Sequence, residues 1–421
     1  GGREVLPEEE VKSVLSELLQ DPQLELIGHN FKYDYKVLYR WGIEVQNLSF
    51  DTMIAAWLLD TTANGYGMDS LAEKHLGYKT VHYSDVVEKG NLFSDVELQA
   101  ASEYAAEDAD VTLRFYEVFA PQLKEMGIAA LFSDVEMPLV RILAAMELRG
   151  IRLLDDRLHE YSQEMAADLK DIEKKIYNEV GYEFNIGSTK QLQEVLFVER
   201  KLKPIKKTKT GYSTDLNVLQ QLAEEDIVPQ LVLQHRGISK LKSTYVDTLP
   251  ELVNEHTGRI HSRFVQTGTA TGRLSSRDPN LQNIPIRDEA GRRIRKAFVP
   301  QEGWKLVSAD YSQIELVVLA HLSGDPELQE AFRSGSDVHS RTGALIFGVK
   351  PEDVSAEQRR IAKTINFGVM YGMSGYRLSQ ELKIPRARAD EFISAYFNRY
   401  AKIQEFIHET VASTEQKGYS E

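Results

Sequence analysis

The hydrophobic periodicity changes along the chain, and these changes constrain the fold more than any other feature of the sequence. Residues 8–125 alternate helical patterns with short apolar runs such as 24–27, which is typical of an α/β unit. Residues 126–255 are almost purely helical, β-type segments follow, and from Asp325 the helical period returns. Because 421 residues are also too many for one ordinary core, we predict a multidomain protein of mixed α/β and α+β class.

Two patterns define expected elements within this outline. Strands are predicted at 261–266, 296–299 and 305–309, and the last of these runs into Asp310. One helix of about five turns is indicated by apolar residues that step by three and four. These residues are Leu158, Tyr161, Met165, Leu169, Ile172 and Ile176.

Composition narrows the class of protein. No apolar run reaches the roughly 18 residues that a membrane-spanning helix needs, so we expect no membrane association. The chain enters a charged helical pattern without the features of a signal peptide, so we expect it to stay in the cytoplasm. Cysteine is absent, so any metal must be bound by Asp, Glu or His.

The net charge of −14 does not exclude a nucleic-acid partner, because phosphate binding depends on local patches. Two basic clusters without an acid lie at 200–209 and 292–296. The residues are Arg200, Lys201, Lys203, Lys206, Lys207 and Lys209 in the first, and Arg292, Arg293, Arg295 and Lys296 in the second. Taken alone, each cluster also fits a solvated loop.

A helix near the C-terminal end carries cations and rings at a constant spacing. Arg359, Lys363, Phe367 and Tyr371 follow one another in steps of four, which places them along one helical stripe. Such a stripe suits a nucleoside triphosphate, because the cations can bind phosphates while the rings flank sugar and base. The same spacing also fits an ordinary amphipathic helix.

Two further segments complete the pattern. Asp310 and Glu315 stand five residues apart after the predicted strand 305–309, an arrangement that also fits an ordinary helix entry. The other is a polar stretch made of residues 269–276 and 278–285, which lies between Gly and Pro breakers and predicts an ordered loop able to contact a DNA duplex. As a bare pattern it also fits ordinary turn chemistry.

In their order and spacing these three segments resemble family A DNA polymerases, in the large, Klenow-type portion of the bacterial members, and the resemblance covers essentially the whole chain. It implies a partial ribonuclease H-like 3′-5′ exonuclease domain at 1–126, followed by a partial right-hand polymerase at 127–421. The implied subdomains are a thumb at about 150–256, part of a palm at about 257–345 and part of the fingers at about 346–421.

The resemblance also implies roles in the polymerase site. Asp310 would be the first catalytic carboxylate, binding two Mg²⁺ ions with the backbone carbonyl of Tyr311 as a further ligand. Glu315 matches the steric gate that selects deoxynucleotides.

Further residues match the ligands of the deoxynucleoside triphosphate and of DNA. His339, Arg359 and Lys363 match triphosphate ligands, and Lys363 is also expected to be catalytic. Phe367 matches the ring beside the sugar, where Phe implies discrimination against dideoxynucleotides, and Tyr371 the ring near the nascent pair. Arg273 and Gln313 resemble minor-groove probes; the other implied DNA contacts are Asn280, Gln282, Asn283, Lys240, Lys242 and Ser243.

The N-terminal part resembles a proofreading exonuclease. The segments 30–34 and 104–108 match its second and third motifs, so Asp34 and Asp108 are expected to bind metal and Tyr104 to hold the attacking water. The spacing of Tyr104 and Asp108 places them on one helix face.

We therefore expect DNA synthesis and proofreading in replication and repair, by a monomer that binds primer–template DNA and deoxynucleoside triphosphates at the bacterial nucleoid. Two alternatives stay open: a DNA-binding nuclease without synthesis, and a non-catalytic, decayed polymerase homologue.

The sequence departs from the family pattern in two missing motifs and one substitution. The Asp-x-Glu motif expected upstream of Asp34 is absent, and no His is followed by Asp after Tyr371, so we expect a sequence truncated at both ends. Val317 stands where the family commonly has Arg, a change that touches neither metal nor triphosphate.

The two missing motifs predict that the 421-residue polypeptide alone neither extends primers nor proofreads. Primer extension by the purified chain is the test, with Asp310→Ala as the background. Incorporation above that background would contradict the prediction.

Overall fold

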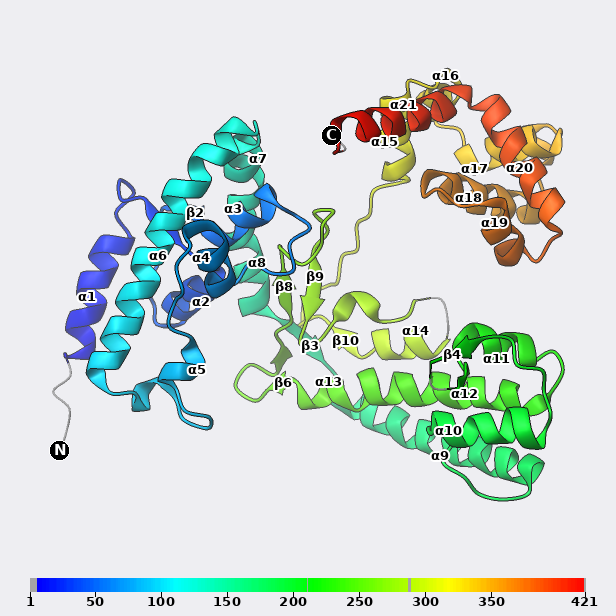
Figure 1. The fold of residues 1–421 in the computed structure, drawn as a ribbon, viewed down its shortest axis with the longest axis horizontal. Helices are drawn as coiled ribbons and strands as arrows, with labels where there is room; N and C mark the ends of the chain where they lie inside the picture. The colour runs from blue at the N-terminus through cyan, green and yellow to red at the C-terminus, as the bar shows by residue number, and fades with distance from the viewer. Residues whose placement is uncertain (1–5, 210, 287–288, 420–421) are drawn as a thin grey trace. The chain divides into compact units, whose positions relative to one another are not determined.

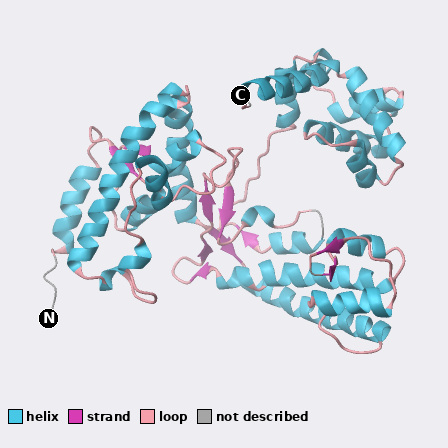
Figure 2. Cartoon of the chain, viewed as in Figure 1, coloured by secondary structure: helices cyan, strands magenta, loops and turns pink. Residues whose placement is uncertain are grey.

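The computed structural model describes residues 6–209, 211–286 and 289–419. The chain forms two compact units, residues 1–306 and 307–421, which are described separately. Helices dominate in both units and the strands are short (Figures 1 and 2). Among the described residues, no helix has the length and apolar character needed to cross a membrane.

The N-terminal part of the first unit is the predicted α/β region. Strands β1 (Leu26–Gly28) and β2 (Leu48–Asp51) pair in parallel, as their connection through a helix requires. Its helices are α1 (Glu8–Leu19), α2 (Lys32–Arg40), α3 (Thr52–Leu59), α4 (Met68–Leu76), α5 (Tyr83–Val86) and α6 (Leu98–Glu125), with a 3-10 turn η1 (Phe93–Asp95).

Asp51 fixes the turns at the ends of both strands. Its buried carboxylate accepts hydrogen bonds from the backbone N–H groups of Asn30 (3.1 Å) and Phe31 (2.8 Å), and from those of Met53 (2.9 Å) and Ile54 (3.3 Å). Burial raises the pKa of Asp51, and the four N–H groups act in the opposite direction. The carboxylate thus caps α3 and holds the segment that precedes Asp34.

The core of this region is built on one face of α6. Val111, Phe115, Phe119 and Leu123 follow one another in steps of four and are at most 2% exposed. They belong to the same cluster as Trp57 of α3. This face therefore anchors the helix that carries Tyr104 and Asp108 near its other end.

The middle of the chain is helical, as predicted. Leu158, Tyr161, Met165, Ile172 and Ile176 of the apolar stripe are buried on α9, which packs against α12. The elements are α7 (Ala129–Leu131), η2 (Phe132–Glu136), α8 (Met137–Arg149), α9 (Asp155–Val180), α10 (Thr189–Gln193), η3 (Glu194–Glu199), β4 (Lys207–Thr208), β5 (Gly211–Tyr212), α11 (Leu216–Leu222), α12 (Ile227–Leu241), η4 (Lys242–Val246) and α13 (Thr248–Glu251).

Two small antiparallel sheets complete the first unit. One has the strand order β10-β3-β7-β6, and the other pairs β8 with β9. The bounds are β3 (Ile151–Leu153), β6 (Val253–Asn254), β7 (Arg259–Ile260), β8 (Arg263–Val265), β9 (Ser275–Arg277), η5 (Leu281–Asn283), α14 (Glu289–Arg295) and β10 (Phe298–Val299). The strands predicted at 261–266 and 296–299 are thus confirmed as β8 and β10.

The strand predicted at 305–309 is wrong. These residues are irregular, and Leu306 and Val307 are 59% and 88% exposed. A strand is stabilised by hydrogen bonds to a neighbouring strand, and no strand in the described ranges pairs with this segment. Asp310 therefore follows an irregular segment instead of a strand end.

The second unit is entirely helical in its described residues. Its core includes Leu316, Leu328, Ile365, Tyr396 and Tyr400, each at most 1% exposed. The helices are α15 (Ile314–Ser323), α16 (Pro326–Arg333), α17 (Val338–Phe347), η6 (Pro351–Asp353), α18 (Ala356–Met370), α19 (Gly375–Leu382), α20 (Arg386–Arg399) and α21 (Ala401–Lys417).

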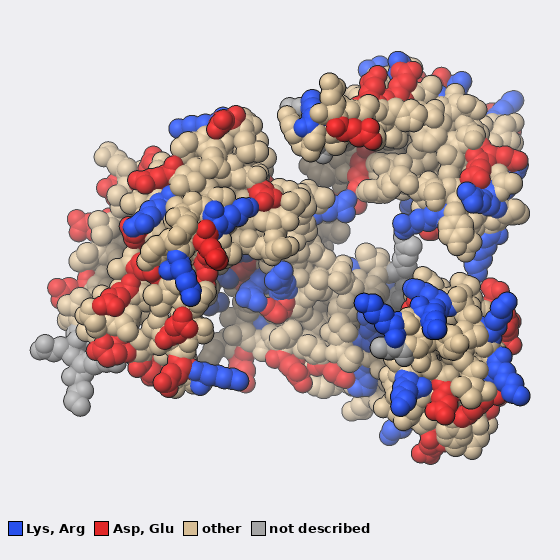
Figure 3. Space-filling model, in the orientation of Figure 1, with Lys and Arg blue, Asp and Glu red and all other residues tan. Residues whose placement is uncertain are grey.

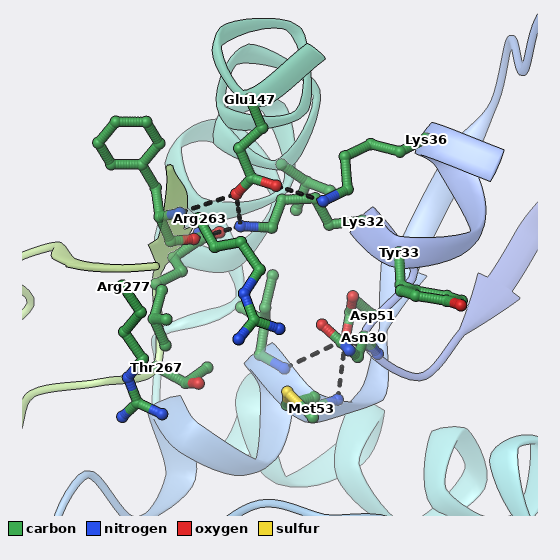
Figure 4. Close-up of a pocket in the computed structure, with 15 residues that line it drawn as sticks. Asn30, Lys32, Tyr33, Lys36, Asp51, Met53, Glu147, Arg263, Thr267 and Arg277 are labelled. Carbon is green, nitrogen blue, oxygen red and sulfur yellow. Dashed lines mark hydrogen bonds and ion pairs between the residues drawn. The ribbon is translucent and has the colours of Figure 1, made fainter. Parts of the chain in front are cut away.

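A buried carboxylate on α8 joins three segments of the first unit. Glu147 is 3% exposed and binds the ammonium groups of Lys32 (2.6 Å) and Lys36 on α2 (Figure 4). The same carboxylate accepts a hydrogen bond from the backbone N–H of Phe264 in β8 at 2.8 Å, and Lys32 also donates to the Phe264 carbonyl. Glu147 therefore holds the α/β region against the β8–β9 sheet.

Replacing Glu147 by Ala should destabilise the first unit by about 3 kcal/mol, because two partly buried ammonium groups would lose their counter-charge. All three tryptophans, Trp41, Trp57 and Trp304, lie in this unit, so urea unfolding followed by tryptophan fluorescence measures the change. The matched control is Glu160→Ala at an exposed position of α9. Equal midpoints for the two variants would contradict the assigned role of Glu147.

Candidate active site

The predicted stripe of cations and rings lies on α18. Arg359, Lys363 and Phe367 are within the helix, and Tyr371 is its C-terminal cap residue. Ser355 starts the helix with a reciprocal capping box, in which its side chain and that of Gln358 each accept from the other residue's N–H (3.2 and 2.9 Å). The spacing of four therefore places these residues along one helix, as the sequence predicts.

The opposite face of α18 packs into the core, and this leaves the stripe accessible. Ala362, Ile365 and Val369 are buried, whereas Lys363 is exposed and Tyr371 is 62% exposed. Phe367 is half-buried. A ligand can thus reach the cations and rings without unfolding the helix.

Arg359 forms a two-point ion pair with Asp337. Its Nε lies 2.7 Å from Oδ2 and its Nη2 lies 3.1 Å from Oδ1 of Asp337. Burial acts to raise the pKa of Asp337, but hydrogen bonds from Arg359 and Ser340 outweigh it and hold the pKa far below its usual range. The carboxylate therefore stays ionised at physiological pH.

His339 is placed beside the stripe by a buried chain of polar groups. Its Nδ1 lies 3.0 Å from Nδ2 of Asn366, and the Asn366 Oδ1 accepts from the Thr342 hydroxyl at 3.2 Å. The Thr342 hydroxyl lies in turn 3.0 Å from that of Tyr400. Burial lowers the pKa of His339. A neutral ring whose Nδ1 accepts from Asn366 carries its proton on Nε2, which makes Nε2–H a donor.

Glu315 and Tyr371 are joined by a hydrogen bond. The Tyr371 hydroxyl donates to Oε1 of Glu315 at 2.6 Å and so links the first turn of α15 to the end of α18. The ring of Phe367 lies 5.8 Å from that of His339 between their centroids. The structure therefore brings together Glu315, His339, Phe367 and Tyr371.

The remaining residues predicted for this site lie before α15. Asp310 is exposed, and Tyr311 is 78% exposed. Gln313 has left-handed backbone angles (φ 55°) at the start of α15, and its carbonyl accepts from Leu316 and Val317. Among the described residues, no group of three or more His, Asp or Glu side chains forms a metal cage.

In the first unit, the predicted nuclease residues Tyr104 and Asp108 do meet on one face of α6. They are hydrogen-bonded, and burial together with the Asp108 carboxylate raises the pKa of Tyr104 to about 12. Burial also raises the pKa of Asp108. Asp34 is exposed on α2, although the protein atoms around its carboxylate raise its pKa.

The loop predicted to contact DNA is ordered by its own side chains. Oε1 of Gln282 accepts from the Ser276 N–H at 3.1 Å, and its Nε2 donates to the Leu274 carbonyl at 2.9 Å. Asn280 caps η5 through its own side chain, and the Asn283 carbonyl accepts from the Tyr245 hydroxyl. Gln282 thus stabilises the loop itself through these hydrogen bonds, which the sequence did not indicate.

Arg273 and Lys240 are exposed, as a DNA contact requires. Lys242 is paired with Asp247 (2.8 Å), and the Ser243 hydroxyl is 3.4 Å from the Lys240 carbonyl. These residues belong to the first unit and the α18 stripe to the second.

Sequence reasoning missed Asp337, Thr342, Asn366 and Tyr400. Asp337 had a local signal, because an Asp three residues before Ser340 at a helix start is typical of an N-cap. The others had none, since their partners come from different helices.

Comparison with known proteins agrees with these features. Residues 4–124 match the family described as 3'-5' exonuclease, and residues 155–421 match DNA polymerase family A. The fold is therefore an exonuclease domain followed by a polymerase domain. The chain belongs to DNA polymerase family A.

Its relatives are bacterial. It is 48% identical over 408 residues to DNA polymerase I of Treponema pallidum, covering 96% of this chain and 41% of that protein. It is 44% identical to DNA polymerase I of Pseudomonas aeruginosa, covering 100% of this chain and 47% of that protein. The chain thus spans less than half the length of either relative.

A solved structure is also similar. The POL domain of Pol1 from M. smegmatis, in complex with DNA primer-template and dNTP, matches with a TM-score of 0.84 and 37% identity. The match covers 99% of this chain and 70% of that one.

The histidine beside the predicted second exonuclease motif should make the first unit sensitive to acid. The ring of His29 is half-buried, and the resulting loss of solvation lowers its pKa from 6.5 to about 4. Because the unfolded chain takes up the proton first, stability is complete above pH 6.5 and falls towards pH 4, by about 3 kcal/mol.

Urea unfolding between pH 7.5 and 4 measures this loss as a difference between the wild type and His29→Gln. A control replaces the exposed His256 by Gln. If His29→Gln follows the wild-type pH profile, protonation of His29 is not the cause of the loss.

Proposed function

We propose that the protein carries out template-directed DNA synthesis from deoxynucleoside triphosphates by two-metal nucleotidyl transfer, with 3′-5′ proofreading, in replication and repair. The observation that carries this proposal is the accessible stripe of Arg359, Lys363 and Phe367 on α18 beside the buried His339. Because the chain spans less than half of its curated relatives, the proposal concerns the activity of the whole protein.

Three groups on two adjacent helices suit a triphosphate. Arg359 offers a planar fork and Lys363 a flexible point charge, which are complementary ways of binding phosphate oxygens. His339 adds the neutral Nε2–H donor that its bond to Asn366 leaves free. Lys363 is exposed, so it can approach the phosphates and neutralise the charge that develops during transfer.

The sugar and base would lie along the rest of the stripe. Phe367 supplies the ring beside the deoxyribose and Tyr371 the ring near the nascent pair. The hydrogen bond from Tyr371 fixes the Glu315 carboxylate, which would exclude a ribose 2′-hydroxyl as the steric gate. Gln313, at the start of the same helix, would probe the minor groove.

Family membership implies catalysis that depends on a divalent metal, and we propose Mg²⁺. The hard oxygen donors of Asp310 and the Tyr311 carbonyl suit this ion, which is commonly bound by one or two carboxylates together with substrate phosphates. Bound there, Mg²⁺ would stabilise charge on the reacting oxygens.

Primer–template DNA is the proposed macromolecular partner. The similar M. smegmatis domain is in complex with DNA primer-template and dNTP. In this chain, Lys and Arg side chains gather around β4–β5 and α11, where the 200–209 run lies (Figure 3). Arg273, Lys240, Lys242, Ser243, Asn280, Gln282 and Asn283 complete the proposed contact surface, whose phosphate contacts predict steep weakening of binding with salt.

In the exonuclease domain, Asp34 and Asp108 would bind metal. Tyr104, whose raised pKa keeps its hydroxyl protonated, would orient the attacking water. We further propose the domain and subdomain limits given by the sequence, a monomer, and a cytoplasmic, nucleoid-associated location in a bacterium. No observation favours a nuclease without synthesis or a decayed homologue.

Replacing Arg359 by Gln should weaken binding of Mg·dATP roughly tenfold to hundredfold, because lost hydrogen bonds to a charged group cost about 1.5–3 kcal/mol. Equilibrium dialysis of the purified chain with radiolabelled dATP measures the change. Arg360→Gln is the control, since Arg360 is the next residue on α18 and is paired with Glu357. Equal affinities of the two variants would contradict the proposal that Arg359 binds the triphosphate.

A further inference from the structure

Asp337 makes two kinds of contact at once. It is the N-cap of α17, where its Oδ2 accepts from the Ser340 N–H at 3.1 Å and from the Ser340 hydroxyl. The same carboxylate holds Nε and Nη2 of Arg359 on α18 at 2.7 and 3.1 Å. The helix start thus fixes the carboxylate, and the carboxylate fixes the guanidinium.

This pairing leaves part of the guanidinium available. An arginine head group has five N–H donors in one plane. Asp337 engages only the edge formed by Nε and Nη2, so Nη1 stays available for a phosphate oxygen. The long arginine side chain also loses its rotamer freedom before any ligand arrives, which lowers the entropic cost of binding.

Asp337 also fixes the relative positions of two residues proposed to bind the triphosphate. His339 follows it by two residues at the start of α17, while Arg359 is in the first turn of α18. The two helices pack against each other, and the ion pair fixes the guanidinium relative to the imidazole. Loss of the pair would leave His339 in place through Asn366, but would free Arg359.

We propose that Asp337 is a positioning residue that presents the free edge of Arg359 to the phosphates of a deoxynucleoside triphosphate. This inference rests on the proposed function of the α18 stripe. A carboxylate that competed with the phosphates for Arg359 would have the opposite effect on affinity, so the sign of the change decides between the two roles.

The test compares Mg·dATP binding by the purified chain and by Asp337→Asn, which keeps a capping oxygen but cannot form the charged two-point pair. We expect roughly tenfold weaker binding, the size of coupling found within one ion-pair network. Asp325→Asn is the matched control, because Asp325 caps α16 in the same way through the Leu328 N–H (3.0 Å). It should bind like the wild type.

A double-mutant cycle separates positioning from helix capping. In an Arg359→Gln background, Asp337→Asn should change the affinity by less than about twofold, because the group that it positions is gone. Circular dichroism checks the fold of each variant. If Asp337→Asn loses helix, Asp337→Ser, which also offers a capping oxygen, takes its place in the cycle.

Tighter or unchanged binding by Asp337→Asn would overturn the inference, and so would equal weakening in both backgrounds, which would reduce Asp337 to a helix cap. Failure of the wild-type chain to bind Mg·dATP would instead refute the proposed triphosphate role of the α18 stripe, and the inference with it. Wild-type binding with no effect of Asp337→Asn would refute the inference alone.

Discussion

The buried carboxylate of Glu147 is the interaction on which the larger unit depends. It binds Lys32 and Lys36 of α2 and the backbone of Phe264, so one side chain joins the α/β domain to the β8–β9 sheet. Such a group is stable in the interior only while its partners are present. The segment 30–34, predicted to be an exonuclease motif, and the loop proposed to contact DNA therefore share one anchor.

In the second unit, too, polar side chains hold other side chains in place. Thr342, Asn366 and Tyr400 form a buried polar chain that holds His339, and Asp337 holds Arg359 from the start of α17. None of these supporting groups was expected to touch a substrate. They place the groups that do, which is why the proposed triphosphate site has a defined geometry before a ligand binds.

Most of the fold could be predicted, and the main error has a physical cause. The apolar stripe of α9 and the stripe of α18 were predicted because helical side chains three and four residues apart meet without help from the rest of the chain. The segment 305–309 has the composition of a strand, yet it is irregular. Strand formation depends on a distant partner, and local composition does not supply one.

The same distinction, between local spacing and contacts with distant residues, applies to the candidate site. The sequence alone determined the order Arg359, Lys363, Phe367 and Tyr371 and their common helix, since these depend on spacing along one element. It also determined the family to which the chain belongs, because the family motifs are read from their order and spacing along the chain. Only the tertiary structure decided that Tyr371 bonds Glu315, that Asn366 orients His339 and that Asp337 holds Arg359. Each of these contacts joins two different helices, and which side chains meet there depends on how the core packs.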